Sequence, residues 1–556
     1  MRVSKLCAPL IGAVIALAAP LAKAHDQDAA PGGERERLGQ VRFEVSCNAA
    51  AQTEFNRAMA LFHSFWFKPA IQSFRHVLEL DPGCGMADWG IAIMSMGNPF
   101  AWPANPKAMK EAADDAAEAR RVGARSPRER DYIGTLPALF NDWETAPHAV
   151  RAKAFAAAMG VVSDHYPDDD EARILYALLL DATALPSDKT FANQRKAASI
   201  LEPLFKKYPD HPGVAHYLIH TYDYAELAEQ GLAAAHAYGA IAPSVPHALH
   251  MPSHIYARVG SWQEMIDSNR ASYEASRAEL ADKTTAVRPY DALHALDYMV
   301  MAELQLGRDQ AAQAVVDEVA AIRKVNVENF PAAYAFAAIP SRYALERSDW
   351  TQASQLSLSP ADMAWAKFPQ AEAILVFSRG LGEARSARVE AAQSDLARLN
   401  QLKGSMQMLA LAYWAQQASV QIDALGAWIA LAGHRDEEAL RMMQAAADAE
   451  DASDKHPVTP GNVVPMRALL GEMLLELKQP KAALEQFQRS LKRDPNRLRT
   501  LFGAGKAAQA SGDRDAAVGY YGRVKALGAQ GDGLRAEVVY ARDFLASAPR
   551  PSSDIR

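Results

Sequence analysis

The chain lacks several features that would point to common functions. Charged residues make up 22% of its 556 positions with a formal net charge of −7, and no stretch is basic enough to follow a phosphate backbone. It contains no Cys-x-x-Cys pair, no phosphate-binding loop and no serine nucleophile elbow. Nucleic acid is therefore not expected as a partner, and the sequence gives no support to the enzyme classes that depend on those motifs.

Long apolar runs are also scarce. After the N-terminus, no segment reaches the about 18 uninterrupted apolar residues that suggest a membrane-spanning helix. At the N-terminus, Arg2 and Lys5 precede an apolar run at 10–21 and the small-x-small sequence Ala22–Ala24. This order is typical of a secretory signal peptide, residues 1–24, that is removed by cleavage. We therefore expect an exported protein, periplasmic or secreted, without a transmembrane segment.

Cysteine is the third scarce feature. Of the three cysteines, Cys7 lies in the expected signal peptide and would be removed with it. Cys47 and Cys84 remain, and in an oxidising compartment such a pair favours a disulfide bond. The alternative is two buried free thiols.

What the sequence has in abundance is helical periodicity. Residues rich in Ala, Leu, Glu and Gln, with apolar positions three and four apart, fill most of the chain and alternate with short Gly, Pro or Asp loops. One spacing recurs in three segments: Ala70, Phe74, Val77 and Pro82; Ala483, Phe487, Ser490 and Pro495; and Ala517, Tyr521 and Val524. This spacing resembles the second helix of the tetratricopeptide repeat, a 34-residue helix–turn–helix unit.

The resemblance implies an all-α fold, a right-handed superhelical solenoid of roughly ten stacked helical hairpins. The first helix of each hairpin would line a concave groove that binds a peptide or protein ligand. The expected organisation is a signal peptide at 1–24, a flexible leader at 25–45, an N-terminal repeat array at 46–350, a C-terminal repeat array at 351–545 and a tail at 546–556. A disulfide between Cys47 and Cys84 would clamp the two ends of the first hairpin.

Histidines are concentrated in two short stretches, "HYLIH" and "PHALHMPSH". In the register of the resembled repeat, their histidines fall at groove-facing places of two consecutive first helices. Two histidines four residues apart present both rings on one helical face, which is a known way to hold a metal ion. Pro252 lies within the second stretch and should kink its helix. The predicted metal ligands are His216, His220, His247, His250, His254 and Asp223.

The predicted ligand types do not identify the metal, since imidazole and carboxylate groups suit zinc, copper or iron. Further groove residues, weaker candidates for the same site, are His63, His294, Asp297, Tyr222 and Tyr256. After signal cleavage His25 would become the N-terminal residue, and an N-terminal histidine can bind copper through its amine and ring. The remaining histidines, His211 among them, have the positions of surface residues.

Three functions remain open at this point. The leading hypothesis is a periplasmic binding protein with a histidine-rich transition-metal site in its groove. The second is a metal-dependent enzyme, a hydrolase or oxidoreductase, that uses the same histidines. The third is a metal-free protein–protein scaffold in which the histidines and tyrosines only form hydrogen bonds. The sequence does not decide whether the protein is catalytic.

Overall fold

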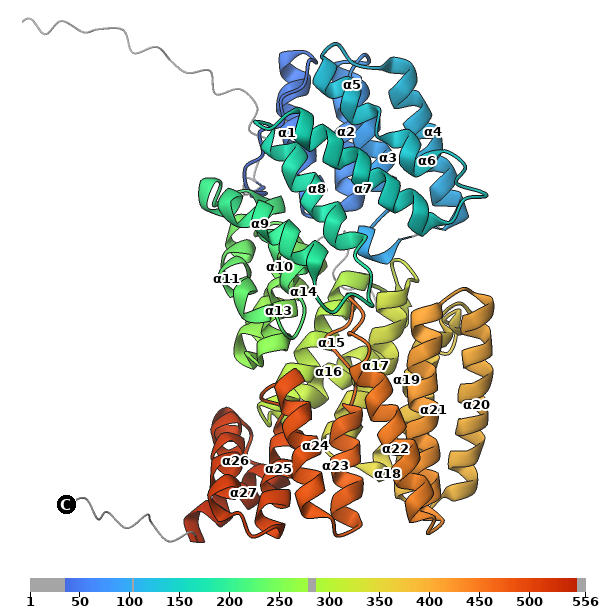
Figure 1. Cartoon of the computed structure of the whole chain (residues 1–556), viewed down its shortest axis with the longest axis vertical. Helices are drawn as coiled ribbons and strands as arrows, with labels where there is room; N and C mark the ends of the chain where they lie inside the picture. Colours follow the sequence, from blue (N-terminus) through green and yellow to red (C-terminus); the bar gives the residue numbers. More distant parts are fainter. Residues whose placement is uncertain (1–35, 103–104, 279–286, 548–556) are drawn as a thin grey trace, which may run out of the picture. The chain divides into compact units, whose positions relative to one another are not determined.

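The computed structural model describes residues 36–102, 105–278 and 287–547. They fold almost entirely as α-helices that follow one another as stacked hairpins (Figure 1). The described residues from Arg37 onwards form one compact unit by their contacts. The expected signal peptide, His25 and most of the tail lie outside the described residues.

The helix bounds are as follows. In the first part of the chain they are α1 (Ala49–His63), α2 (Phe67–Leu80), α3 (Gly85–Ser95), η1 (Pro99–Ala101), α4 (Pro106–Val122), α5 (Pro127–Ile133), α6 (Leu136–Phe140), α7 (His148–His165), α8 (Asp170–Ala182), α9 (Ala192–Lys207), α10 (Pro212–Tyr222), η2 (Ala228–Gly231), α11 (Leu232–Ile241), α12 (Pro246–His250), α13 (Pro252–Val259) and α14 (Trp262–Ala278). In the second part they are α15 (Tyr290–Gln305), α16 (Asp309–Ala321), α17 (Phe330–Glu346), α18 (Trp350–Ala353), η3 (Trp365–Lys367), α19 (Pro369–Arg385), α20 (Val389–Met408), α21 (Ala412–Ala432), α22 (Asp436–Asp451), α23 (Met466–Glu476), α24 (Pro480–Arg493), α25 (Leu498–Ala510), α26 (Arg514–Leu527), η4 (Gly528–Gln530) and α27 (Ala536–Ser547). Two short parallel strands, β1 (Val287–Arg288) and β2 (Lys324–Val325), pair beside α15. Among these helices none is long and apolar enough to cross a membrane.

At two places the recurring aromatic residue packs against the first helix of the next hairpin. A Cβ atom on Gly90 of α3 would lie 2.5 Å from the ring of Phe74 on α2, so only glycine leaves room for that ring. Phe487 on α24 packs in the same way against Gly503 of α25. Since an aromatic ring fills the space that a small residue leaves open, adjacent helices approach closely. The predicted all-α array of tetratricopeptide-type hairpins is confirmed.

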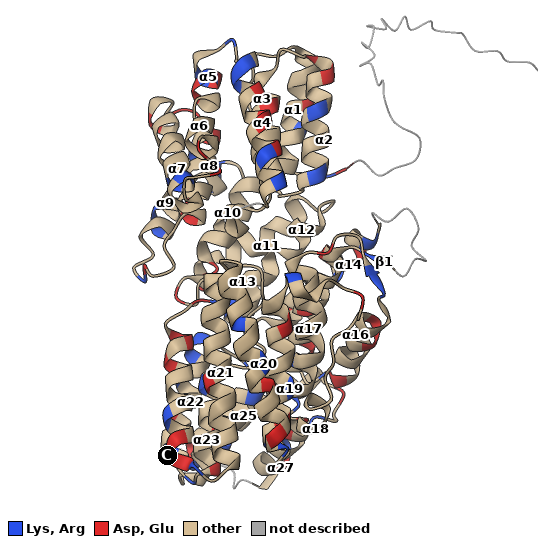
Figure 2. Ribbon diagram, turned by 90° about the vertical axis from the view of Figure 1, so that its right-hand side faces the viewer, with Lys and Arg blue, Asp and Glu red and all other residues tan. Residues whose placement is uncertain are grey.

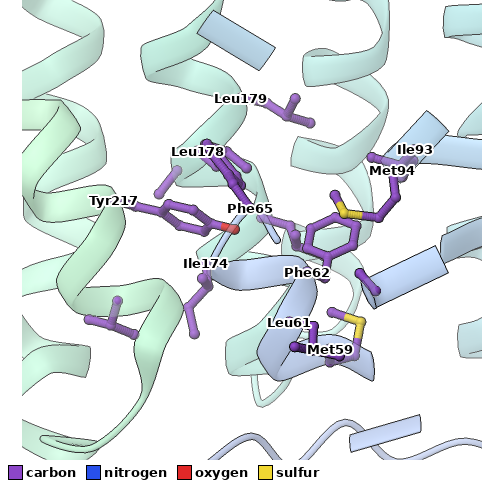
Figure 3. Packing of buried hydrophobic residues seen from close by; sticks show 14 of the residues in the cluster. Met59, Leu61, Phe62, Phe65, Ile93, Met94, Ile174, Leu178, Leu179 and Tyr217 are labelled. Carbon is purple, nitrogen blue, oxygen red and sulfur yellow. The ribbon is translucent and has the colours of Figure 1, made fainter. Parts of the chain in front are cut away.

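Buried apolar residues form two large clusters. The first runs from Leu38 to Ala302 and the second from Leu293 to Ala541, so helix α15 contributes to both. Figure 3 shows part of the first cluster, in which Phe62 of α1, Leu178 of α8 and Tyr217 of α10 come together from separate hairpins. Helices far apart in the sequence thus share one core, as expected for stacked repeats.

The predicted flexible leader is wrong for the residues that precede α1. Leu38, Val41 and Phe43 are buried, and Phe43 is fully inaccessible to solvent. The backbone N–H of Phe43 donates to Asn56 Oδ1 at 3.0 Å, and its ring centroid lies 5.3 Å from that of Phe55. Burial of these apolar side chains stabilises the fold, so residues 38–43 belong to the packed structure.

The predicted disulfide is confirmed. Cys47 lies just before α1 and Cys84 just before α3, and the two are bonded with their Cα atoms 5.4 Å apart. The bond closes the hairpin formed by α1 and α2. The two cysteines are 37 positions apart in the sequence. In the chain-entropy account, closing a loop of that length stabilises the fold by about 3–4 kcal/mol.

Where a kink is expected at Pro252, the helix is interrupted at one residue, Met251, whose backbone keeps helical angles. Helix α12 ends at His250 and α13 begins at Pro252, with Met251 between them. Proline has no N–H to continue the helical ladder, and the hydroxyl of Ser253 donates to the His250 carbonyl at 2.6 Å.

Candidate metal centre

Six of the predicted histidines converge from the first helices of three consecutive hairpins. The broken helix α12–α13 carries three of them, and α10 and α15 supply the rest. They are His216 and His220 on α10, His247 and His250 on α12, His254 on α13 and His294 on α15. We call this set the six-histidine cluster.

The first three members form one triad. The Nε2 atom of His216 lies 3.2 Å from Nε2 of His220 and 3.3 Å from Nε2 of His247. One ring nitrogen from each of the three histidines lies within 4.8 Å of the other two. Three imidazole nitrogens so placed can coordinate one metal ion.

The other three members form a second triad beside the first. The Nε2 atoms of His250 and His254 are 3.1 Å apart, and His294 completes the group within the same 4.8 Å limit. The ring centroids of His220 and His254 are 6.2 Å apart, as are those of His247 and His250. Each triad can hold one ion, and two such ions would be neighbours.

Hydrogen bonds at the opposite ring nitrogens decide which nitrogen is free. His216 Nδ1 donates to the carbonyl oxygen of His63 at 2.6 Å, and His254 Nδ1 donates to Asp223 Oδ2 at 3.0 Å.

His250 Nδ1 lies 2.7 Å from Asn269 Oδ1. Because Asn269 Nδ2 donates to the Met265 carbonyl at 2.8 Å, the amide orientation is fixed and Oδ1 must be the acceptor.

These assignments place two nitrogen lone pairs against each other. In neutral His250 and His254 the Nδ1 atoms carry the protons, so the Nε2 atoms facing each other at 3.1 Å are both acceptors. The hydroxyl of Tyr298 lies 3.3 Å from His254 Nε2 and 3.2 Å from the Val458 carbonyl, and its single proton can be donated to only one of them. Two nitrogens bound tetrahedrally at about 2.0–2.1 Å from one metal ion stand roughly 3.3 Å apart. A cation between the rings would turn this repulsion into coordination.

Burial keeps the cluster neutral. It lowers the pKa of His216, His220 and His250 well below the ordinary value, and the neighbouring histidines lower it further. The pKa values of His247 and His294 are also well below that value, again chiefly through burial, although both side chains are partly exposed. Neutral imidazoles keep the lone pair that a metal ion needs. The histidines thus form a mostly buried cluster, in place of the open groove surface that the repeat register suggested.

Asp223 lies behind the second triad. One oxygen accepts from His254 Nδ1, and the carboxylate also binds Arg258 Nε at 2.8 Å and Lys455 Nζ at 2.5 Å. A carboxylate in this position orients the ring and fixes its tautomer, as the outer partners of metal-bound histidines commonly do. The structure therefore places Asp223 as a partner of a candidate ligand.

Of the weaker candidates, one lies in the second triad and three lie outside both triads. His294 joins the second triad. Asp297 pairs with Arg342 at 2.9 Å, while the Tyr222 hydroxyl donates to Glu202 at 2.6 Å. Tyr256 lies against His236, with ring centroids 5.8 Å apart. These three side chains have partners of their own away from both triads.

His63 belongs to a separate buried group that includes His211, which the sequence placed on the surface. His63 Nε2 and His211 Nε2 each lie 3.0 Å from one oxygen of Glu171. We call these three residues the Glu171 group. Burial alone would raise the pKa of Glu171, but the two histidines that face it lower the pKa well below its usual range.

Sequence reasoning missed Asn269, Lys455 and Glu171. Asn269 could have been found, because it interrupts the apolar face of α14 formed by Met265 and Ile266. A polar residue at such a position is expected to have a specific partner. Lys455 lies in the loop after α22, 232 residues along the chain from its partner Asp223, and no local sequence pattern marks it.

Comparison with known proteins supports the repeat assignment in one segment. Residues 464–497, which contain α23 and α24, match the sequence profile of the tetratricopeptide repeat. No curated protein sequence matches the chain. Among solved structures, a human IFIT1 dimer with PPP-AAAA is 13% identical over 88% of this chain and 99% of its own, with a TM-score of 0.34. A human IFIT1 dimer with m7Gppp-AAAA is 12% identical over 87% and 96%, also with a TM-score of 0.34.

A similarity as low as this gives no information on what the present chain binds. The repeat assignment rests on the matched segment, on the recurrence of its spacing at both ends of the chain and on the hairpin packing described above. The chain is an all-α protein of stacked helical hairpins that carries a tetratricopeptide repeat at residues 464–497.

Proposed function

We propose that this protein binds two transition-metal ions, one in each triad of the six-histidine cluster. The observation that carries the proposal is the pair His250 and His254, whose Nε2 lone pairs face each other at 3.1 Å while both Nδ1 atoms donate to oxygen acceptors. Such a contact is repulsive between neutral rings and becomes favourable around a cation.

The proposed ligands follow from the two triads. His216, His220 and His247 would bind the first ion through Nε2 atoms, and His250, His254 and His294 the second. The His63 carbonyl, Asn269 and Asp223 would hold three of the rings from behind. Outer hydrogen bonds of this kind raise ligand basicity and fix ring orientation.

An enzymatic role is the second candidate, and the ligand count favours it. Structural metal sites usually have four protein ligands, whereas catalytic sites have three and leave one position for water or substrate. Each triad offers three. The partly exposed rings of His247 and His294, one in each triad, leave a side from which a small molecule can approach.

We also propose that the protein is exported, and binding of a peptide or protein partner is the alternative to metal binding. Action in the periplasm or outside the cell is supported by the Cys47–Cys84 disulfide, since such bonds persist in oxidising compartments. Binding of a peptide or protein partner on the hairpin array is the alternative to a metal function. That alternative predicts that substitutions in the cluster weaken partner binding without changing metal content.

The test is the metal content of protein purified from its own compartment without an affinity tag, measured by mass spectrometry. Wild type should contain two ions per chain, and His216→Ala or His250→Ala should lose one or both. His236→Ala is the matched control, because His236 is an exposed histidine on α11 whose ring binds Glu264 at 3.0 Å. Circular dichroism establishes that each variant is folded. Wild-type protein that holds no metal, even after incubation with zinc and copper, would refute the proposal.

A further inference from the structure

The surroundings of the six-histidine cluster are poor in negative charge. Helices α10, α11 and α12 contain no Asp, Glu, Lys or Arg, and Figure 2 shows them without red or blue segments. Behind His254, the carboxylate of Asp223 is paired with Arg258 and Lys455. The candidate ligand atoms of both triads are imidazole nitrogens, with no carboxylate oxygen among them.

This charge balance selects among metals. Two divalent ions bound by six neutral imidazoles would place four positive charges in a mostly buried cluster, with no carboxylate among the ligand atoms to offset them. Paired iron or manganese ions in helical proteins are normally held by several glutamates. Imidazole also suits copper, which binds more tightly than the other divalent metals of its row and has a stable monovalent state. Two Cu(I) ions would add only two charges.

We infer that the six-histidine cluster holds a pair of copper ions and that the reduced pair binds one molecule of dioxygen between them. The inference rests on the proposed two-metal function and adds the metal, its oxidation state and the small-molecule ligand. Each Cu(I) ion gives up one electron and becomes Cu(II). The dioxygen accepts both electrons and becomes a bound peroxide whose O–O bond stays intact, so no proton or further reductant is required.

The geometry suits a ligand shared by both ions. Each triad leaves a coordination position open, and the 6.2 Å centroid separations between rings of opposite triads place the two ions next to each other. The ring of Phe100 stacks on His220 with centroids 4.0 Å apart, and that of Phe65 lies 4.4 Å from His216. These apolar rings restrict water around the first triad, which favours binding of an apolar diatomic molecule.

The experiment uses the full chain loaded with Cu(I) under anaerobic conditions. Copper per chain is measured first, and dioxygen uptake is then followed with an electrode after mixing with oxygenated buffer. We expect two copper ions per chain and one dioxygen molecule per two ions. The oxygenated protein should give little Cu(II) resonance signal in electron paramagnetic resonance, because the spins of two bridged Cu(II) ions couple. Protein loaded with zinc is the control and should consume no oxygen.

The outcomes separate the inference from the proposed function. Two copper ions without oxygen uptake, or two zinc ions with no binding of Cu(I), would overturn the inference and leave the two-metal site standing. Absence of any bound metal would overturn both. His294→Ala should keep the first ion, lose the second and consume no oxygen. Should that variant fail to fold, His294→Gln offers the same comparison with a side chain of similar size.

Discussion

Two groups of buried histidines in this molecule look alike by proximity and differ in their protons. In the Glu171 group, His211 Nδ1 accepts from the Val214 backbone N–H at 3.3 Å, so its Nε2–H donates to Glu171. His63 Nδ1 accepts from the Tyr217 hydroxyl at 2.9 Å, and its Nε2–H donates to the other oxygen of Glu171. Each of these contacts pairs a donor with an acceptor.

The second triad of the six-histidine cluster has no such pairing. His250 and His254 both use their Nδ1 protons on oxygen acceptors, and their Nε2 atoms then oppose each other. Ligand atoms within 4.8 Å of one another occur in both groups. Distance alone therefore does not distinguish a metal site from a closed hydrogen-bond network, whereas the count of donors and acceptors does.

The largest expected effect lies in the Glu171 group. Glu171→Ala would leave the Nε2–H donors of His63 and His211 buried without their shared acceptor, and each unsatisfied buried donor costs about 1–3 kcal/mol. Chemical denaturation should show this loss while the metal content of the folded protein stays at the wild-type value. Glu79→Ala is the matched control, since Glu79 binds His76 at 2.9 Å with both side chains largely exposed, and it should cost less than about 1 kcal/mol. A loss of metal in Glu171→Ala would make the Glu171 group part of the metal site.

The next prediction concerns how much bound metal stabilises the six-histidine cluster. Metal present at a hundred times its dissociation constant should stabilise the wild-type protein by about 2.7 kcal/mol. His254→Gln should abolish much of this increment, yet leave the metal-free protein close to wild type, because the amide N–H of glutamine can donate to His250 Nε2. Thermal or denaturant unfolding with and without metal measures both quantities. His211→Gln is the counterpart in the Glu171 group: it should lower the metal-free stability and keep the metal increment. The opposite pattern would mean that the two groups have been assigned the wrong way round.

Much of the candidate site was predictable because it depends on local spacing. A separation of four residues places His216 with His220, and His250 with His254, on single helical faces. The repeat spacing then assigns these helices to consecutive hairpins, and it brought in His294 as a weaker candidate. The hairpin fold and the Cys47–Cys84 bond follow from the same periodicity.

The parts that were missed come from packing between segments distant in sequence. Lys455 reaches Asp223 from the loop after α22, and Glu171 of α8 meets His63 of α1. Such contacts depend on how successive hairpins turn relative to one another, which no spacing within a hairpin encodes. The buried stretch from Leu38 to Phe43 was missed because its short, irregular apolar pattern has no helical period.

The smallest expected effect tests the proton assignment on which the comparison depends. Asn269→Leu removes the oxygen that accepts from His250 Nδ1, so the ring of His250 is free to turn or to move its proton to Nε2. Removal of such an outer partner typically weakens metal binding about 10- to 100-fold. Competition with a chelator of known affinity measures the change at the second triad.

Ser272→Ala, one turn further along α14, removes a hydroxyl that donates to the Pro246 carbonyl at 2.8 Å and should leave the affinity within about twofold. Asn269→Asp keeps an oxygen acceptor and should retain tight binding. If Asn269→Leu folds and binds metal as tightly as wild type, the Nε2 lone pair of His250 is not fixed by Asn269, and the contrast between the two histidine groups would have to rest on His254 and Asp223 alone.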